Sequence, residues 1–393
     1  MPSRDDAARP PTIAMVDTTL TPYRLHFHRR VVRELRLRLL TWHLRAHDAL
    51  PWRLSVPDGL QVESFAGARE PGRAAEVVAG RRVLGALRDR RVDAVVVGGY
   101  GDLARLMIIL GCQRAGTPVL LFGDSNVSGD LARGARRLAK RAVLPLLLRR
   151  CSAILACGSR GEDYFSRYGV PSERIFLSPY EPDYDLLARA SDEPPESAAA
   201  RWGLSPARRR LLFVGRLAPE KRVDLAVEGF GRIAGERPEW DLVVAGTGAE
   251  GAALKALAAR SAPGRVHFVE FVQPARLPSL YRACHALVLP SDYEPWGVVV
   301  NEAVAVGLAL VCADVVGAAA ELLVDGVDGY TFRVGDVDDL VRALRRVTDP
   351  SRLESLRAGG AAVLASWRRR ADPVVGLGAA LARAGVRVQD RTS

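Results

Sequence analysis

The chain has 393 residues, of which 48% are hydrophobic and 26% are charged, as is typical of a soluble globular protein of two or three domains. No run of eighteen apolar residues occurs and the first ten residues are polar, so we expect neither a membrane-spanning helix nor a signal peptide. Five cysteines without paired spacing or a metal-binding pattern favour buried thiols in a reducing cytoplasm.

The formal net charge of +11 is concentrated in the N-terminal half. Residues 1–190 hold 30 basic and 20 acidic residues, whereas residues 191–393 hold 26 and 25. The densest basic segment contains Arg133, Arg136, Arg137, Lys140 and Arg141 and closes with Arg149 and Arg150 after an apolar run. Such a helix can lie on an anionic membrane, although a solvated basic face over a buried apolar stripe is the simpler interpretation. No aromatic residues interleave it, so we expect no nucleic-acid partner.

Short apolar strands alternate with helical stretches along the chain. In the first half we expect strands at residues 12–16, 37–42, 94–97, 119–122 and 153–156. In the second half we expect them at residues 211–214, 242–245, 266–269, 286–289 and 309–312. This alternation predicts an α/β protein with two doubly wound parallel sheets. The expected domains are residues 1–185 and 208–350, with a linker at 186–207 and C-terminal helices at 351–393.

A glycine-rich turn follows the strand expected at residues 242–245. Gly246, Gly248 and Gly251 match the dinucleotide-binding pattern G-x-G-x-x-G, and Glu270 ends the next strand, where such sites place an acidic residue. That motif normally opens its domain, whereas here a complete strand–helix unit precedes it. The glycines equally suit a tight strand-to-helix turn with close packing. A nicotinamide site is therefore an alternative, not the preferred interpretation.

Two carboxylates eight positions apart are the most informative feature of the sequence. Glu294 lies in a Pro/Gly loop, and Glu302 lies on an apolar segment that is predicted to be a helix. Gly297 marks the turn before that helix, whose N-terminus offers unpaired N–H groups and partial positive charge to a diphosphate. Upstream, Arg216 and Lys221 follow a strand and provide two cations of the kind that bind phosphate.

The stretch around Glu294 and Glu302 resembles the paired-glutamate signature of retaining glycosyltransferases of family 4, which have the GT-B fold. Residues 213–221 and 314–329 resemble two further family segments in the same order. The N-terminal half matches loosely, at residues 21–24 and 168–176. The resemblance implies two Rossmann-like domains facing a cleft, with a C-terminal helix crossing back to the first domain. It also implies a nucleotide-diphosphate sugar as co-substrate, with no metal and no other cofactor.

Residue roles follow from the resemblance alone. It makes Glu294, Arg216 and Lys221 catalytic, with Glu294 holding the donor sugar and the two cations neutralising the departing phosphate. The implied donor-binding residues are Glu302 at the ribose, together with Gly297, Val298, Gly215 and Glu270. Asn301 is expected to be orientational or exposed, and Glu321 to be a structural acid. Gly317-Ala318 departs from the family, which commonly has two glycines there.

The N-terminal domain is expected to bind the acceptor. Tyr23 and Arg24 follow the first strand, at the mouth of a doubly wound sheet where ligands bind, and they resemble the acceptor-side loop of some family members. Asp124 stands where many relatives have a sugar-contacting histidine. His26 and His28 are two positions apart and cannot share a helix face, so we expect each in the core or on the surface.

We therefore expect a cytoplasmic retaining glycosyltransferase that acts on a small secondary metabolite or a glycan. The basic segment also allows a membrane-associated transferase at the inner membrane face, acting on a lipid-linked acceptor. Two further functions compatible with the motifs are a non-catalytic sugar-nucleotide binder and an NAD-dependent oxidoreductase.

Overall fold

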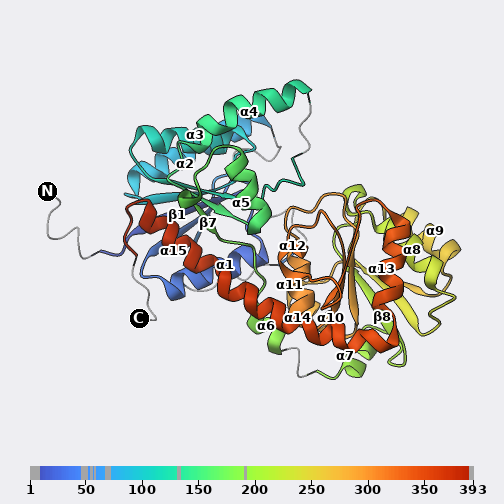
Figure 1. The fold of residues 1–393 in the computed structure, drawn as a ribbon. Coiled ribbons are helices and arrows are strands. Elements are labelled where there is room, and N and C mark those ends of the chain that lie inside the picture. The colour runs from blue at the N-terminus through green and yellow to red at the C-terminus, as the bar shows by residue number, and fades with distance from the viewer. Residues whose placement is uncertain are drawn as a thin grey trace. The chain divides into compact units, whose positions relative to one another are not determined.

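The structure is a computed structural model that describes residues 9–45, 52–53, 56, 59–66, 72–130, 134–189 and 193–388. The chain divides into two compact units, one of Met1–Tyr180 with Ala371–Ser393 and one of Glu181–Arg370. Figure 1 shows that each unit is a sheet with helices on both faces. Among the described residues, no helix is both long enough and apolar enough to cross a membrane.

The first unit is built on seven parallel strands in the order β3-β2-β1-β4-β5-β6-β7. The strands are β1 Thr12–Asp17, β2 Arg38–His43, β3 Gln61–Ser64, β4 Ala94–Gly98, β5 Val119–Gly123, β6 Ala153–Ala156 and β7 Ile175–Leu177. The helices are α1 Pro22–Glu34, α2 Arg73–Asp89, α3 Leu103–Arg114, α4 Gly134–Leu148, α5 Gly158–Arg167, the 3₁₀ turn η1 Ser172–Arg174 and α15 Pro373–Arg383. Because β1 is flanked by β2 and β4, the direction of winding reverses between β1 and β4.

The second unit is built on six parallel strands in the order β10-β9-β8-β11-β12-β13. The strands are β8 Arg209–Val214, β9 Trp240–Ala245, β10 Val266–Val269, β11 Ala286–Leu289, β12 Ala309–Ala313 and β13 Gly329–Phe332. The helices and 3₁₀ turns are α6 Tyr184–Arg189, α7 Pro195–Arg201, η3 Pro219–Lys221, α8 Val223–Ile233, α9 Gly251–Ser261, η4 Pro274–Arg276, α10 Leu277–Arg282, α11 Val298–Ala305, α12 Ala319–Leu322, α13 Val337–Val347 and α14 Pro350–Arg370. Here the winding reverses between β8 and β11.

The segment expected as a linker, residues 186–207, lies within the second unit. It contains α7, which packs against α10, and a helix packed on its own unit is not a free connection. The acidic, proline-rich residues 193–197 therefore mark the start of a helix, since Pro195 is the first residue of α7.

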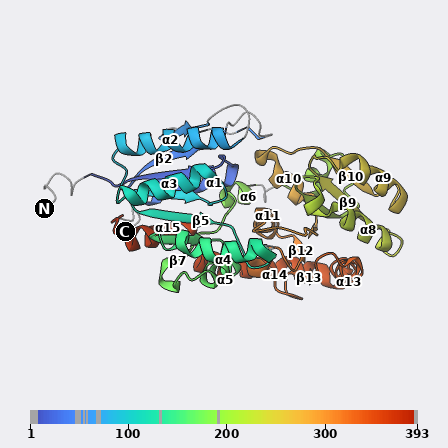
Figure 2. The ribbon, with the colours of Figure 1, turned by 90° about the horizontal axis from the view of Figure 1, so that it is seen from above.

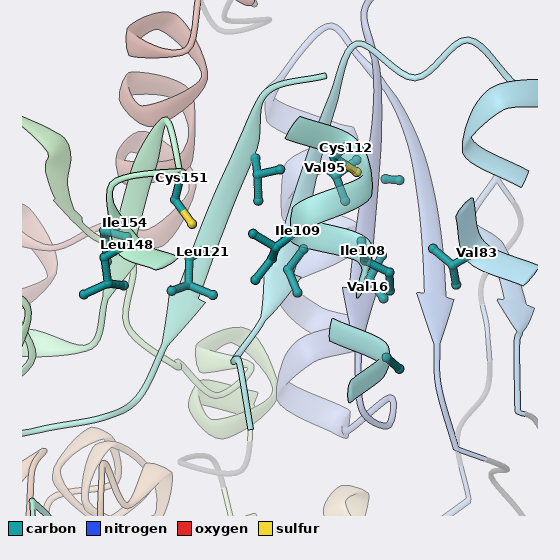
Figure 3. Close-up of a cluster of buried hydrophobic side chains, with 14 of the residues drawn as sticks. Val16, Val83, Val95, Ile108, Ile109, Cys112, Leu121, Leu148, Cys151 and Ile154 are labelled. Carbon is teal, nitrogen blue, oxygen red and sulfur yellow. The ribbon is translucent and has the colours of Figure 1, made fainter. Parts of the chain in front are cut away.

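Apolar strands form the cores because parallel strands are covered on both faces. All six residues of β1 and all six of β9 are buried. Figure 3 shows the core cluster of the first unit, which includes Val16 of β1, Ile108 of α3 and Leu121 of β5. All five cysteines are unbridged and buried. Burial raises the pKa of the Cys112 and Cys151 thiols to about 12, so these thiols serve as core residues.

The C-terminal chain crosses back from the second unit to the first. Helix α14 belongs to the second unit, whereas α15 packs against β6, β7 and α1 of the first. Asp372 caps α15 by accepting hydrogen bonds from the N–H groups of Val374 and Val375 at 2.9 and 3.1 Å. A Cβ at Gly376 would lie 1.8 Å from the carbonyl oxygen of Leu177, so α15 can pack this closely on β7 only with a glycine there.

We predict that Gly376→Ala destabilises the first unit, because the added methyl group forces α15 off β7. Overpacking of this kind costs roughly 1–3 kcal/mol. The measurement is the free energy of unfolding in urea. Gly85→Ala in α2 is the matched control, since a Cβ there meets nothing within 4 Å, and helix propensity makes that variant equal to or more stable than wild type. Equal stability of the two variants would contradict the proposed close approach.

Candidate active site

The carboxyl edge of the second sheet brings two charged side chains together at the point of reversal. Lys221 ends η3, the turn after β8, and Glu294 lies in the loop after β11. Lys221 Nζ forms an ion pair with Glu294 Oε2, and the two side chains are 16% and 12% exposed. Ser291 Oγ donates to the same carboxylate oxygen over 3.4 Å. Partial burial makes this pair stronger than a surface salt bridge.

Backbone hydrogen bonds join the three loops around this pair. The N–H of Asp292 donates to the carbonyl of Glu220 at 3.0 Å, and the N–H of Gly317 donates to the carbonyl of Glu294 at 3.0 Å. A Cβ at Gly317 would lie 2.0 Å from the carbonyl oxygen of Pro295, so the close approach requires glycine there. Ala318, at the position where the sequence departs from the family, is fully buried and donates to the Trp296 carbonyl at 2.7 Å. The departure therefore leaves the loop packing intact.

Helix α11 begins beside Glu294. Gly297 caps it with φ of +90°, a conformation that favours glycine, and Val298 is its first residue. Glu302 lies in the second turn, where its Oε2 accepts a hydrogen bond of 2.6 Å from the hydroxyl of Tyr281. No sequence pattern pointed to Tyr281, because the six-residue helix α10 that carries it is too short for a periodic pattern.

The carboxyl of Glu302 is a weaker acid than that of an ordinary glutamate. Burial raises the pKa of its carboxyl to about 7, and the hydrogen bond from Tyr281 opposes part of that rise. Burial, together with the nearby Glu302, also raises the pKa of Tyr281 well above its ordinary value. Near neutral pH, Glu302 is therefore a mixture of acid and carboxylate, and a ligand that donates hydrogen bonds to it would favour the carboxylate.

Arg216 does not join this group of side chains. Its side chain is 74% exposed, and its Nη2 donates a hydrogen bond of 2.9 Å to the carboxylate of Glu220, four residues further along the chain. A surface ion pair of this kind contributes little free energy, so Arg216 can exchange Glu220 for a phosphate at small cost. Its role at a phosphate stays a prediction.

The glycines of the G-x-G-x-x-G match serve backbone packing. A Cβ at Gly246 would lie 1.9 Å from the carbonyl oxygen of Gly215, and a Cβ at Gly248 would lie 2.2 Å from that of Leu217. The loop after β9 is thus pressed against the loop after β8, which leaves these two glycines fully explained by packing. Glu270, the acidic residue of that match, is exposed at the end of the edge strand β10.

Asn301, expected to be orientational or exposed, is fully buried. Its Oδ1 accepts a hydrogen bond of 3.1 Å from Trp296 Nε1, and its Nδ2 donates to the Tyr184 hydroxyl at 3.1 Å. Asn301 therefore ties α11 to the loop before it and to α6. The side chain of Glu321 is also buried and forms an ion pair with Arg370, the last residue of α14.

The first sheet has a cavity of about 190 Å³ at its own point of reversal. Tyr23, Arg24 and Asp124, the three residues expected on the acceptor side, all line it. Tyr180 also lines it and packs edge-on against Tyr23, with ring centroids 5.0 Å apart. Hydroxyl, carboxylate and aromatic groups thus surround one small space.

Arg24 is held in place from within the first unit. Its guanidinium donates three hydrogen bonds to the Asp17 carboxylate at 3.0 to 3.1 Å and lies 4.7 Å from the ring centroid of Phe122. His28 is fully buried, as expected for a core position, and its Nδ1 lies 3.1 Å from Thr41 Oγ1. Burial, with Arg24 nearby, lowers the pKa of His28 well below its ordinary value. Arg24 and Asp17 therefore line the cavity as a hydrogen-bonded pair.

Two doubly wound parallel-sheet units with polar side chains gathered at each reversal define the GT-B class of fold. Residues 196–359 match the family described as glycosyl transferases group 1, and residues 8–181 match the glycosyl transferase 4-like domain. The chain therefore belongs to the group 1 glycosyltransferases.

Individual relatives agree with this assignment. The chain is similar to alpha-D-kanosaminyltransferase of Streptomyces kanamyceticus, at 29% identity over 254 residues, which are 63% of this chain and 61% of that enzyme. It shares its fold with sucrose-phosphate synthase of Thermosynechococcus elongatus, at a TM-score of 0.75 and 16% identity over 94% of this chain and 97% of that one. It likewise resembles Anabaena HepE, solved with UDP and glucose, at a TM-score of 0.70 and 17% identity over 93% and 96%. The match to the kanosaminyltransferase thus spans less than two thirds of that enzyme.

We predict that Glu302→Gln changes the pH dependence of stability. The pKa of Glu302 is raised in the folded protein, so the carboxyl stabilises the fold below the ordinary pKa of Glu, and this contribution is lost as pH rises to about 7. The unfolding free energy of the variant, relative to wild type, should therefore rise from about pH 4.5 to about pH 7 and then level off. Glu354→Gln, a control at a 74% exposed side chain, should show no such rise.

Proposed function

We propose that this protein is a retaining glycosyltransferase that moves a sugar from a nucleotide diphosphate to an acceptor hydroxyl without a metal ion. The observation that supports it best is the Lys221–Glu294 ion pair beside the start of α11, at the reversal between β8 and β11. A cation and a helix N-terminus there suit a diphosphate, and a carboxylate beside them suits sugar hydroxyls.

Each group has a part in the proposed reaction. The bond between the anomeric carbon and the phosphate oxygen breaks, the acceptor oxygen bonds to that carbon, and the acceptor proton passes to the departing phosphate. Lys221 and the N–H groups at Val298 offset the negative charge that develops on the phosphate. Arg216 joins them after leaving Glu220. Glu294 accepts hydrogen bonds from the sugar, and Glu302 accepts them from the ribose.

Relatives suggest the first donors to test. HepE was solved in complexes with UDP and with UDP-glucose, and the kanosaminyltransferase is named for a kanosaminyl group. We propose a UDP-linked hexose as the donor class, bound without Mg²⁺ or Mn²⁺. Gly246 and Gly248 are needed for close backbone packing against Gly215 and Leu217, and this packing role argues against a nicotinamide site at the motif. A measurement of sugar transfer distinguishes a transferase from a protein that binds a nucleotide sugar without catalysis.

The acceptor is proposed to bind in the cavity of the first unit. A volume of about 190 Å³ is enough to hold a single small ring. Tyr23 and Tyr180 line the cavity with aromatic rings, and Asp124 and the threonines after β1 offer hydrogen-bonding groups. A hydroxylated ring is therefore the proposed reacting part of the acceptor, whether it is a small metabolite or the end of a larger molecule.

Variants of the charged groups test the mechanism. Lys221→Ala, Glu294→Gln and Arg216→Ala should each lower kcat for sugar transfer by about 10²–10³-fold in buffer that contains EDTA. Glu220→Gln, which releases Arg216 from its ion pair, is the matched control and should retain activity. Normal transfer by both Lys221→Ala and Glu294→Gln would place the active site elsewhere, and a full requirement for added Mn²⁺ would overturn the metal-free route.

Donor affinity should depend on pH through Glu302. Ribose hydroxyls donate to the carboxylate form, so binding should tighten as Glu302 ionises around its pKa of about 7. The Kd of UDP-glucose, measured by calorimetry, should fall about tenfold between about pH 6 and about pH 8. Glu302→Gln should bind more weakly and without this pH dependence. A flat wild-type profile would remove Glu302 from the ribose site.

A further inference from the structure

Helix α4 exposes large apolar side chains to solvent. Leu138, Val143 and Leu146 are 69%, 63% and 57% exposed, whereas Leu144 and Leu148 are 4% and 1% exposed and form part of the core. The helix thus carries apolar residues on its outward side as well as its inward side. Figures 1 and 2 show α4 at the outside of the first unit. The outward apolar residues do not fit the simpler interpretation of the sequence, a solvated basic face over a buried stripe.

This exposure is unusual within the protein. Among the described residues, four large aliphatic side chains are more than half exposed, and three of them lie on α4. The fourth is Val375 on α15, which is 70% exposed. Single exposed apolar side chains are ordinary, but three within nine positions of one helix mark an interaction surface.

The helix is also strongly basic. Residues 134–150 contain six basic residues and no acidic one. Arg137 and Arg141 of α4 are exposed, as are Arg149 and Arg150 in the turn that follows the helix. Arg133, part of the basic segment in the sequence, lies outside the described residues, and the side chain of Arg136 is likewise not described. The exposed surface of α4 therefore combines aliphatic groups with guanidinium groups.

Contacts with the rest of the first unit fix which side of α4 faces outward. Lys140 Nζ forms a 2.7 Å ion pair with Asp130 and lies 5.0 Å from the ring centroid of Tyr164. The hydroxyl of Tyr168 donates to the same Asp130 carboxylate at 2.7 Å. Lys140 therefore lies on the inward side of the helix, and a rotation of α4 that buried its outward side would break these contacts.

The same network reaches the cavity of the first unit. The Tyr164 hydroxyl lies 2.6 Å from the Tyr100 hydroxyl, which in turn lies 3.3 Å from Ser125 Oγ. Ser125 follows Asp124, a residue of the cavity lining. A surface bound by α4 would therefore be connected to the acceptor cavity through a few packed side chains.

We propose that α4 docks on an anionic lipid bilayer, with Leu138, Val143 and Leu146 entering the interface and the surrounding arginines contacting lipid phosphates. Aliphatic and cationic groups exposed along the same short segment match the two layers of such an interface. A second copy of the same face is disfavoured by like charge. The inference about the acceptor rests on the proposed function: an enzyme bound to the bilayer would receive a lipid-linked acceptor whose hydroxylated ring enters the cavity.

Vesicle co-sedimentation tests the proposal without donor or acceptor, so its result does not depend on the proposed enzymatic activity. Wild type should bind vesicles of phosphatidylglycerol and phosphatidylcholine at low salt, bind phosphatidylcholine alone at least about tenfold more weakly, and lose affinity as salt rises. Absence of binding to the anionic vesicles at low salt would overturn the proposal.

Matched variants locate the surface. A triple variant that combines Leu138→Gln, Val143→Gln and Leu146→Gln should bind vesicles at least about tenfold more weakly. The control variant Val375→Gln should bind them as wild type does. A second triple variant, with Arg137→Gln, Arg141→Gln and Arg149→Gln, should weaken vesicle binding about 10²-fold. Its control replaces three exposed arginines of the second unit, Arg260→Gln, Arg342→Gln and Arg352→Gln, and should not weaken binding. Thermal unfolding of each variant checks the fold. Equal losses in test and control variants would overturn the proposal, as would a stable dimer in light scattering that disappears with the aliphatic substitutions.

Discussion

Both units depend on the right-handed crossover between parallel strands. Because helices must join successive strands with one handedness, a sheet that grows outward on both sides of its first strand leaves a gap at the carboxyl edge where the winding reverses. In the second unit this gap lies between β8 and β11, and Lys221 meets Glu294 there. In the first unit it lies between β1 and β4, beside the cavity that Tyr23 lines. Hydrogen bonds such as that from Gly317 to Glu294 then hold the loops in place.

Most of the strands that could be predicted from the sequence are buried on both sides, because burial produces the continuous apolar runs that the sequence shows; the exception is the partly buried edge strand β10. Ten expected strands are present, three of them with the expected bounds and seven with a shift of one or two residues at one or both ends. The short strands β3, β7 and β13 were not expected. Strand β3 consists of Gln61-Val62-Glu63-Ser64 at a sheet edge, where one side faces solvent and no apolar run is needed. Helix α7 is hard to distinguish from a linker by sequence, because its proline and acidic residues suit a loop as well as a helix start.

In the candidate site, loop positions that follow strands could be inferred, but side-chain partners could not. Spacing along the chain places Lys221 and Glu294 at neighbouring strand ends, and the two side chains do meet. The same spacing gives no information on rotamers, so the exposed pairing of Arg216 with Glu220 was not foreseen. Likewise, Tyr281 reaches Glu302 from a separate helix, and only tertiary packing brings them to 2.6 Å. The outward aliphatic side chains of α4 escaped prediction because an apolar pattern on a helix does not reveal which neighbours cover it.

The position of α15 has a consequence for how the protein is made. Synthesis proceeds from the N-terminus, and N-terminal domains commonly fold first as they leave the ribosome. Here α15, Pro373–Arg383, packs on β6 and β7, so the first unit cannot complete its packing until both the first unit's strands and the whole second unit have emerged. The second unit, Glu181–Arg370, contains no later segment and can fold before it. During synthesis the nascent first unit therefore leaves a sheet face uncovered, and it is this face that a chaperone would have to shield until α15 has emerged from the ribosome.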